Sequence, residues 1–467
     1  MARRYDIVLV GGGAAGLIGA GFAARLGVKV ALLEKERIGG DCTWTGCVPS
    51  KTVIRSAHVA HDIARAEQFG MRVEPAIPDM RSVHGRVQRT IAAIYEHTTP
   101  EALRARGIDA YIGPTRFVDA RTLSCGGELI QARRIVICTG AHAVVPDLPG
   151  LARIPILTYG QFFDFDTLPS HLLVLGAGPL GIEMAQAFRR FGANVTVIGP
   201  AVLEREEPEA QTLIREILQR EGVEVVLERV TEARQSGVRV ELRTARGWHS
   251  GERVLVAAGR TPNVEDLNLE RAGVAYDAHG IKVNKYLRTT ARHIYACGDV
   301  IGGPQFSHLA GYECFKAVRN ALLPGRTAGK ADVLPAVTFT DPEVARVGLT
   351  EAEARRRHGK RIEVHLRPMA RADRALCDGD TDGFIKLVTR GRKNILGATI
   401  VASRGGEMIA EVALAMKSGL GVDAIAETIH AYPTWATEVQ LAAVDILMDR
   451  VTSGISGRVV RWLSQRG

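Results

Sequence analysis

Short apolar runs alternate with amphipathic segments along the chain. Residues 7–10 form an apolar, β-branched run that breaks at glycines, and a helical pattern follows to Arg25. A second apolar run over residues 28–33 ends in Glu34. A strand, a glycine turn, a helix and a second strand predict a βαβ unit.

The same pattern returns later in the chain. Residues 172–175 read as a strand, a glycine turn and a helix to about Phe191 follow, and residues 195–198 read as the next strand. Two such units predict two dinucleotide-binding folds on one chain. They therefore indicate two nucleotides, a flavin and a nicotinamide.

The remaining segments complete a predicted α/β protein. Residues 52–110 look mostly helical, and residues 115–137 and 221–258 read as short strands. From about Ala336 the pattern becomes a strand–helix mixture typical of α+β domains. We expect two Rossmann-like dinucleotide-binding domains followed by a C-terminal α+β domain.

Composition narrows the function classes. The net charge of +9 comes from scattered basic residues without interleaved aromatic side chains, so we expect anionic cofactors and no nucleic acid. Seven cysteines in 467 residues are too few for a secreted disulfide framework. No apolar run reaches the ~18 residues of a spanning helix, and we expect a soluble, cytoplasmic protein.

The first glycine turn matches the G-x-G-x-x-G fingerprint. Its glycines permit the tight turn, the approach of a pyrophosphate and close helix–strand packing. Glu34 follows 18 residues after the last glycine, where an acid can bind a ribose 2′-hydroxyl. The predicted nucleotide-binding residues of this turn are Gly11, Gly13, Ala14 and Gly16.

The second fingerprint, Gly176, Gly178 and Gly181, lacks the acid. Gly199 stands where Glu34 stood in the first copy. A 2′-phosphate is therefore not repelled, although neither residue 199 nor 200 is a base that would hold it. The missing acid favours NADPH as the nucleotide of this turn, and NADH is the alternative.

Cys42 and Cys47 are the most informative pair of residues. They lie five apart, just after a flavin-type βαβ unit, and suggest a local disulfide formed across a distorted helix start. Pro49 fits the first turn of a helix and places Cys47 near its N-terminus, where a thiolate is favoured. Two inert thiols or half of a zinc site are the alternatives, but no second Cys or His pair is nearby and we predict no metal site. The other cysteines are expected to be unpaired small core residues: Cys125, Cys138, Cys297, Cys314 and Cys377.

With these motifs, the sequence strongly resembles the flavoprotein pyridine-nucleotide disulfide oxidoreductases, which include dihydrolipoamide dehydrogenase, glutathione reductase and mercuric reductase. The resemblance covers essentially the whole chain and rests on both fingerprints, residues 39–51, Thr139-Gly140, residues 258–260 and residues 297–299. It implies a homodimer with an FAD-binding domain over residues 1–150, an NAD(P)H-binding domain over 151–265, a segment over 266–335 that completes the FAD domain, and a dimerisation domain with a short basic tail over 336–467.

The resemblance also implies roles for single residues. Cys47 would be the charge-transfer thiolate beside the flavin, and Cys42 the outer sulfur that exchanges with the substrate. Lys51 would lie near flavin N5, paired with Glu183, and Asp299 would bind the ribityl chain. The other cofactor-binding residues that it implies are Gly40, Thr139, Gly140, Gly259, Arg260 and Gly298.

The pattern breaks near the C-terminus. Disulfide-reducing members carry His-Pro-Thr-x-x-Glu, whose histidine is the general base. Here Tyr432 stands in the place of the histidine and Thr437 in the place of the glutamate. A phenol with a reference pKa near 10 is a poor base at neutral pH. His430, two residues away, is a candidate substitute, although a structural role is favoured.

Tyrosine at this position is similar to mercuric reductase, but the C-terminal cysteine pair of those enzymes is missing from this sequence. The leading prediction is therefore an enzyme that passes electrons from NAD(P)H through FAD and the Cys42–Cys47 pair to a metal ion or small oxidant. A disulfide substrate is the second possibility, and a redox-sensing flavoprotein that binds a partner is the alternative from another class.

The C-terminal tail carries Arg458, Arg461 and Arg466. We expect it to pack on the dimer rather than contact a membrane.

Overall fold

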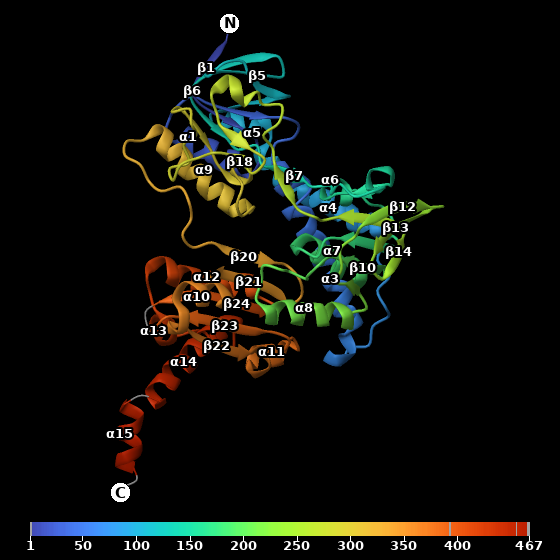
Figure 1. The fold of residues 1–467 in the computed structure, drawn as a ribbon, viewed down its shortest axis with the longest axis vertical. Coiled ribbons are helices and arrows are strands. Elements are labelled where there is room, and N and C mark those ends of the chain that lie inside the picture. The colour runs from blue at the N-terminus through green and yellow to red at the C-terminus, as the bar shows by residue number, and fades with distance from the viewer. Residues whose placement is uncertain (1, 392–393, 454, 465–467) are drawn as a thin grey trace. The chain divides into compact units, whose positions relative to one another are not determined.

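The computed structural model describes residues 2–391, 394–453 and 455–464. The chain divides into two compact units (Figure 1). The first unit contains residues 1–200 and 221–331, and the second contains residues 201–220 and 332–467.

A seven-stranded sheet forms the centre of the first nucleotide-binding fold. Its strands are β1 (Arg3–Val10), β2 (Val30–Glu34), β3 (Ile108–Ile112), β4 (Thr115–Phe117), β5 (Thr122–Cys125), β6 (Glu128–Ile137) and β19 (Ile294–Ala296). The order is β3-β2-β1-β6-β5-β4, with β19 also paired to β6. Strands β3, β2, β1, β6 and β19 are parallel, whereas β4 and β5 join antiparallel. The late strand β19 thus brings part of the predicted 266–335 segment into the first sheet.

Helices cover this sheet, which explains why its strands are continuously apolar rather than alternating. The helices that pack on it are α1 (Ala14–Arg25), α5 (Pro100–Ala105) and α9 (Ser307–Leu322). The other helices of this fold are α2 (Gly40–Trp44), α3 (Cys47–Ala64) and α4 (Met80–Tyr95), with the 3-10 turns η1 (Ala66–Phe69), η2 (Glu96–Thr98) and η5 (Gly298–Ile301). Helix α1 packs along α9. Asp79 caps α4 by accepting from the amides of Arg81 and Ser82.

The second nucleotide-binding fold has a five-stranded parallel sheet. It contains β8 (Ile156–Leu157), β9 (His171–Leu175), β10 (Asn194–Ile198), β11 (Glu224–Val226) and β15 (Arg253–Val256), in the order β11-β10-β9-β15-β8. The helices are α6 (Tyr159–Phe162) and α7 (Pro179–Arg190). Helix α7 packs against α3.

Smaller elements complete the first unit. A three-stranded antiparallel sheet contains β12 (Glu232–Ser236), β13 (Arg239–Thr244) and β14 (Gly247–Gly251). Two short ladders pair β7 (Ala141–Ala143) with β16 (Arg260–Pro262), and β17 (Tyr276–Asp277) with β18 (Gly280–Ile281). The remaining 3-10 turns are η3 (Leu151–Arg153) and η4 (Leu269–Ala272).

The second unit is an antiparallel sheet with helices. Its strands are β20 (Pro335–Thr338), β21 (Glu343–Gly348), β22 (Glu363–Pro368), β23 (Phe384–Thr389) and β24 (Ile395–Ala402), in the order β20-β21-β24-β23-β22. Its helices are α8 (Pro208–Arg220), α10 (Glu351–His358), α11 (Asp373–Asp378), α12 (Gly405–Ser418), α13 (Val422–Glu427), α14 (Trp435–Ser453) and α15 (Ile455–Ser464), with η6 (Gly359–Arg361) and η7 (Met369–Arg371). The predicted fold class, two Rossmann-like folds and an α+β domain, is confirmed.

The cysteines outside the Cys42–Cys47 pair differ from expectation in two ways. Cys377 is exposed on α11, so its prediction as a core residue is wrong. Cys138, Cys297 and Cys314 are buried as expected, but they share one core and their sulfurs lie within hydrogen-bonding reach of one another. Neighbours of this kind come from strands and helices far apart in sequence, so spacing gave no sign of them.

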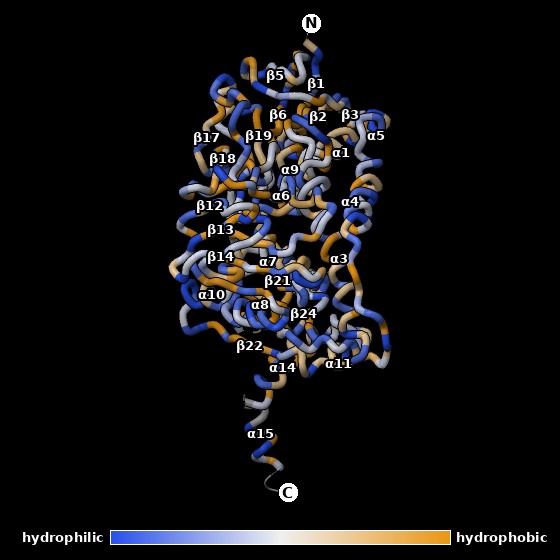
Figure 2. Tube along the Cα trace, turned by 90° about the vertical axis from the view of Figure 1, so that its right-hand side faces the viewer, coloured by the Kyte–Doolittle hydropathy of each residue, from blue (hydrophilic) through white to orange (hydrophobic). Residues whose placement is uncertain are grey.

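The predicted basic tail forms α15, along which hydrophilic and hydrophobic residues follow one another (Figure 2). Arg466 lies outside the described residues. Among the residues with described structure, no helix has both the length and the apolar character needed to cross a bilayer. The cytoplasmic location stays a prediction.

A buried lysine holds the second unit together electrostatically. Lys386 on β23 is 1% exposed, and its ammonium contacts Glu207 at 3.1 Å, Glu209 at 2.8 Å and Glu351 at 2.9 Å. Glu207 is itself buried. These contacts connect the segment that enters α8, α8 itself and α10 with strand β23, which explains why residues 201–220 belong to this unit.

Replacing Lys386 with Met should strongly destabilise the second unit. Removing one partner of a buried ion cluster leaves carboxylates without their counter-charge and costs about 3–5 kcal/mol. Equilibrium urea unfolding measures the loss. Lys417→Met is the control, because Lys417 and Asp332 are exposed and 3.8 Å apart, and an exposed pair contributes about 0–1 kcal/mol. Equal urea midpoints for the two variants would contradict the assignment.

Candidate active site

The first glycine turn is closed by contacts that only glycine permits. A Cβ built on Gly11, whose φ is +114°, would lie 2.3 Å from the Cys138 carbonyl oxygen. A Cβ on Gly16 would lie 1.9 Å from the Gly11 carbonyl oxygen. Helix α1 begins at Ala14, directly after the turn. The amide of Gly12 donates to Glu34 Oε2 at 2.7 Å, so a carboxylate is held beside the turn.

The surroundings of this turn fit a dinucleotide such as FAD. In front of Gly13, the space that a Cβ would occupy has only the Cα of Gly40 nearby, at 3.8 Å. The backbone is thus open to a pyrophosphate at the start of α1. Gly140 also faces open space at a φ of +74°. Asp299 lies in η5 directly after Gly298, whose amide donates to Glu313 at 2.8 Å.

The second turn repeats this construction with one difference. Cβ atoms on Gly176 and Gly181 would lie 2.4 Å from the Ala257 oxygen and 2.1 Å from the Gly176 oxygen, respectively, while Gly178 has open space. Gly259, at a φ of +128°, also faces open space. A Cβ on Gly199 would lie only 2.9 Å from the amide nitrogen of Ala177. Here no carboxylate occupies the place that Glu34 takes in the first turn.

The two cysteines lie on either side of a helix break. Cys42 is in α2 and Cys47 begins α3, with Gly46 between them at φ −120° and ψ −106°. A Cβ on Gly46 would lie 2.9 Å from the Asp41 carbonyl oxygen, so the close approach of α2 and α3 requires glycine. The break brings the Cys42 thiol into hydrogen-bonding contact with the Cys47 sulfur.

The surroundings of the pair make the two thiols unequal. The hydrogen bond from Cys42 lowers the pKa of Cys47 to about 6, and contributions from Ser307 and the Lys51 charge act in the same direction, whereas burial and Glu183 oppose it. The same sulfur–sulfur bond, with burial, raises the pKa of Cys42. Cys47 is therefore the thiolate at neutral pH, and Cys42 keeps its proton.

Lys51 and Glu183 form the ion pair that the family resemblance implies. Lys51 Nζ donates to Glu183 Oε2 at 2.9 Å, and the Glu183 side chain is 4% exposed. The packing of α3 on α7 brings the two residues together across 132 positions of sequence. Thr139, by contrast, uses its hydroxyl to donate to the Asn263 carbonyl at 2.8 Å.

A charged network joins the cysteine motif to both nucleotide-binding folds. Arg260 donates to Asp41 at 2.6 Å, to the Ala141 carbonyl at 3.1 Å and contacts Asp299 at 3.2 Å. The Tyr159 hydroxyl donates to the same Asp41 oxygen at 2.8 Å. The terminal nitrogens of Arg260 are thus engaged by protein groups, while its Nε is buried without a partner among the described residues. Its predicted role in cofactor binding stays a prediction.

Sequence reasoning missed Asp41, Tyr159 and Ser307. Asp41 lies inside the cysteine motif and could have been noticed as a charge next to Cys42. Tyr159 and Ser307 gave no signal, because their partners are more than 100 positions away in the chain.

The two C-terminal candidates, Tyr432 and His430, are both occupied by local hydrogen bonds. The Tyr432 hydroxyl donates to Asp373 at 2.7 Å, and this bond raises the pKa of Tyr432. His430 contacts the Thr428 carbonyl at 2.8 Å through Nδ1 and Glu411 at 3.0 Å through Nε2. Burial lowers the pKa of His430, but the bonds to Glu411 and Thr428 outweigh it and the net shift is upward.

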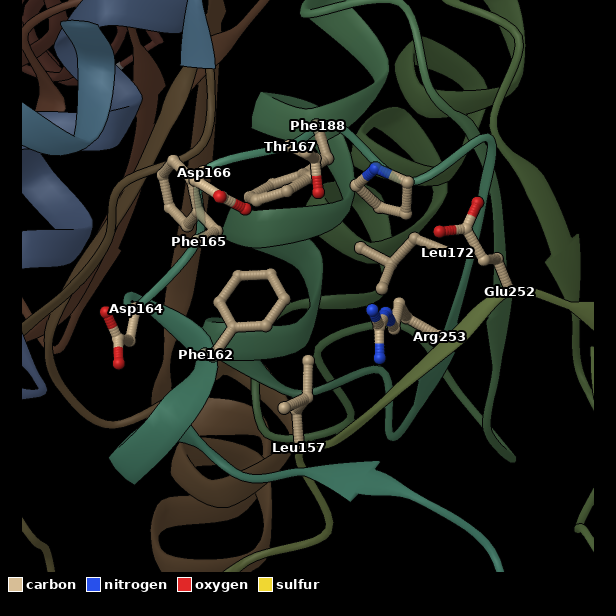
Figure 3. Close-up of a pocket in the computed structure, with 11 residues that line it drawn as sticks. Leu157, Phe162, Asp164, Phe165, Asp166, Thr167, Leu172, Phe188, Glu252 and Arg253 are labelled. Atoms are coloured by element: carbon tan, nitrogen blue, oxygen red, sulfur yellow. The ribbon is translucent and has the colours of Figure 1, made fainter. Parts of the chain in front are cut away.

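A pocket of about 180 Å³ lies elsewhere in the first unit (Figure 3). Phe162, Phe165 and Phe188 line it together with the acids Asp164 and Asp166. Of the described residues that line it, none belongs to the predicted site. Its lining carries more acids than bases, since Arg253 is set against Asp164, Asp166 and Glu252, and this charge does not suit an anionic nucleotide. The sites above are open turns rather than this cavity.

Two glycine turns for two nucleotides, together with a cysteine thiolate paired with a protonated thiol, define a two-nucleotide oxidoreductase with a redox dithiol. Comparison of the sequence with known protein families leads to the same class. Residues 5–314 match the model of the pyridine nucleotide-disulphide oxidoreductases, and residues 334–443 match the dimerisation domain of the same family. The chain belongs to this family and is a flavoprotein disulfide oxidoreductase that uses FAD and NAD(P)H.

Relatives with different substrates are similar to the chain. Mercuric reductase from Bacillus cereus is 34% identical over 94% of this chain and 71% of its own length. Dihydrolipoyl dehydrogenase from Geobacillus stearothermophilus is also 34% identical, over 96% of this chain and 97% of its own length. The structure of the HOCl-induced flavoprotein disulfide reductase RclA from Escherichia coli superposes with a TM-score of 0.86 at 29% identity, covering 94% of this chain and 99% of that one. RclA has also been solved as a Cu(II) complex.

The lowered pKa of Cys47 predicts a pH profile. In the two-electron-reduced holoenzyme, the long-wavelength thiolate–flavin absorbance should persist as the pH falls and disappear with a midpoint near pH 6, because protonation removes the thiolate below its pKa. Anaerobic absorbance titration measures this midpoint. Cys42→Ala should move it upward by removing the hydrogen bond to Cys47, and Cys47→Ser should abolish the band. A midpoint near the ordinary thiol value of 8.5 would contradict the assignment.

Proposed function

We propose that the chain works as a homodimer in which electrons pass from NAD(P)H to FAD, then to the Cys42–Cys47 pair, and finally to a soft metal ion or small oxidant. When bound, FAD supplies acceptance of hydride from the nicotinamide and two-electron exchange with the cysteine pair. Oxidation of the pair, from the Cys47 thiolate and the Cys42 thiol, forms one sulfur–sulfur bond, delivers two electrons to the acceptor and releases the one proton that Cys42 holds.

The protein residues divide this work between them. Cys47 holds the thiolate, and Cys42 is the outer sulfur that meets the acceptor. Lys51, kept in place by Glu183, places a positive charge that favours the thiolate on Cys47. The open backbone at Gly13 and Gly178 is suited to the two pyrophosphates.

The observation that carries the choice of acceptor is the state of Tyr432 and His430. Exchange with an organic disulfide needs a base that takes and returns the proton of the leaving thiol. Tyr432 donates to Asp373, and both ring nitrogens of His430 are occupied. The Tyr432 hydroxyl is a poor base at neutral pH, and His430 has no ring nitrogen left for that task. A metal ion or small oxidant takes electrons from thiolates without such a base.

The similar proteins also support a metal ion or small oxidant as the acceptor. Five mercuric reductases, from five different bacteria, are among the relatives that are 32–35% identical to the chain. RclA, whose structure resembles that of the chain, forms a complex with Cu(II). The similarity to dihydrolipoyl dehydrogenases is the specific observation that keeps a disulfide substrate as the second candidate.

Purified holoenzyme should oxidise NADPH at least about tenfold faster, in kcat/KM, with Hg(II) or Cu(II) than with lipoamide or glutathione disulfide. A missing general base costs about 10²–10⁴-fold in proton transfer, which would penalise only the disulfides. Stopped-flow absorbance of NADPH measures the rates, with Cys42→Ser as the control that should lose every dithiol-dependent turnover. Fast reduction of lipoamide would overturn the choice of acceptor in favour of the second candidate.

We also propose NADPH as the preferred nucleotide. In the first turn, Gly12 donates to the Glu34 carboxylate. In the second turn, Ala177 and Gly199 occupy the two corresponding positions, and Gly199 brings no negative charge that would repel a 2′-phosphate.

The double substitution Ala177→Gly with Gly199→Glu should shift the preference towards NADH. It recreates the glycine–carboxylate pairing of the first turn, whereas Gly199→Glu alone would place its Cβ 3.1 Å from the Ala177 Cβ. Gaining a bond to the 2′-hydroxyl and losing the 2′-phosphate should change the ratio of kcat/KM values about 10–100-fold, since a hydrogen bond to a charged group contributes roughly 1.5–3 kcal/mol. An unchanged ratio in a well-folded double variant would refute the role of position 199.

A further inference from the structure

Ser307 contacts the sulfurs from an element far from the cysteine motif. Its Oγ lies 3.4 Å from Cys47 Sγ, and it is also within hydrogen-bonding reach of Cys42. The contact spans 260 positions of sequence. A serine hydroxyl rotates freely and donates one proton at a time, so it can serve only one of the two sulfurs at any moment.

The fold fixes the position of Ser307, while its hydroxyl can still rotate. Ser307 is the first residue of the sixteen-residue helix α9, which packs along α1. The N-cap of α9 is Phe306, which has no capping side chain. The amides of the first turn are therefore not satisfied by an N-cap, and the positive end of the helix dipole lies where Ser307 meets Cys47. Both features favour negative charge on the sulfur.

Turnover as proposed above requires the negative charge to change place. The resting dithiol carries its charge on Cys47, whereas Cys42 must become the thiolate to meet the acceptor. The balanced step moves one proton from Cys42 to Cys47, so that one sulfur gains an S–H bond and the other loses it, with no electron transferred. A donor that follows the charge from one sulfur to the other lowers the cost of this step.

We propose that Ser307 is a catalytic residue whose hydroxyl donates a hydrogen bond to whichever sulfur of the pair carries the negative charge. In the resting dithiol the bond goes to Cys47, and during attack on the acceptor the hydroxyl rotates to Cys42. This role rests on the proposed electron path through the pair. It goes beyond that path because it assigns the switching of the thiolate to a residue outside the cysteine motif.

The test compares Ser307→Ala, which removes the hydroxyl, with Ser307→Thr, which keeps it. In Ser307→Ala, the pH midpoint of the long-wavelength band should rise by about one to two pH units, because a hydrogen bond to a charged group is lost. The pH profile of Cys47 alkylation by iodoacetamide, followed by mass spectrometry, should move by the same amount. Ser307→Thr should keep the wild-type midpoint.

Rapid-reaction kinetics separate this role from simple packing. Ser307→Ala should slow reoxidation of the dithiol by Hg(II) about tenfold while leaving reduction of the enzyme by NADPH unchanged. Ser56→Ala is the matched control: Ser56 lies on α3, the helix that Cys47 begins, and its hydroxyl donates to the Thr52 carbonyl at 3.3 Å. That control should leave both rates and the midpoint unchanged.

The outcomes are distinct. A wild-type enzyme without the long-wavelength band would overturn the proposed electron path, and this inference with it. A wild-type band whose midpoint is unmoved in Ser307→Ala would overturn the role of Ser307 alone. A shift in Ser307→Thr equal to that in Ser307→Ala would also overturn it, since the hydroxyl is retained there.

Discussion

The hydrogen bond between the Cys42 and Cys47 sulfurs depends on a break between two helices, and the chemistry of the site depends on that bond. On one continuous helix, residues five apart do not face each other. Gly46 interrupts the helix, and any side chain there would collide with the Asp41 carbonyl oxygen. The break lets one thiol stabilise the other as a thiolate, so the two sulfurs take different roles before any cofactor or substrate arrives.

The elements around the cysteine pair place charged and hydroxyl side chains close to it. Helix α3 carries both Cys47 and Lys51, and its packing on α7 supplies Glu183 as the partner of the lysine. The N-terminus of α9, a helix of the same nucleotide-binding fold, brings Ser307 to Cys47 from 260 positions further along the chain. Asp41, next to Cys42, is held by Arg260 and Tyr159. Each of these contacts joins segments that are distant in sequence, so the first unit must be folded before the thiols become unequal.

The same family fold occurs in relatives that are named for different reactions. The chain is 34% identical both to a mercuric reductase and to a dihydrolipoyl dehydrogenase. In the region of His430 and Tyr432, the hydrogen-bonding capacity of the side chains is used locally. Function within such a family is decided at the site rather than by the fold.

The sequence by itself determined the features that depend on local backbone geometry. Glycine spacing defined both nucleotide turns, apolar runs defined the parallel strands, and Pro49 with the two cysteines defined the start of α3, because these signals lie within a few residues of one another. Only the tertiary structure decided which side chains meet. The contact of Ser307 with Cys47, the network around Arg260 and the burial of Lys386 join residues from distant elements, and their energies depend on packing and desolvation that no local pattern encodes.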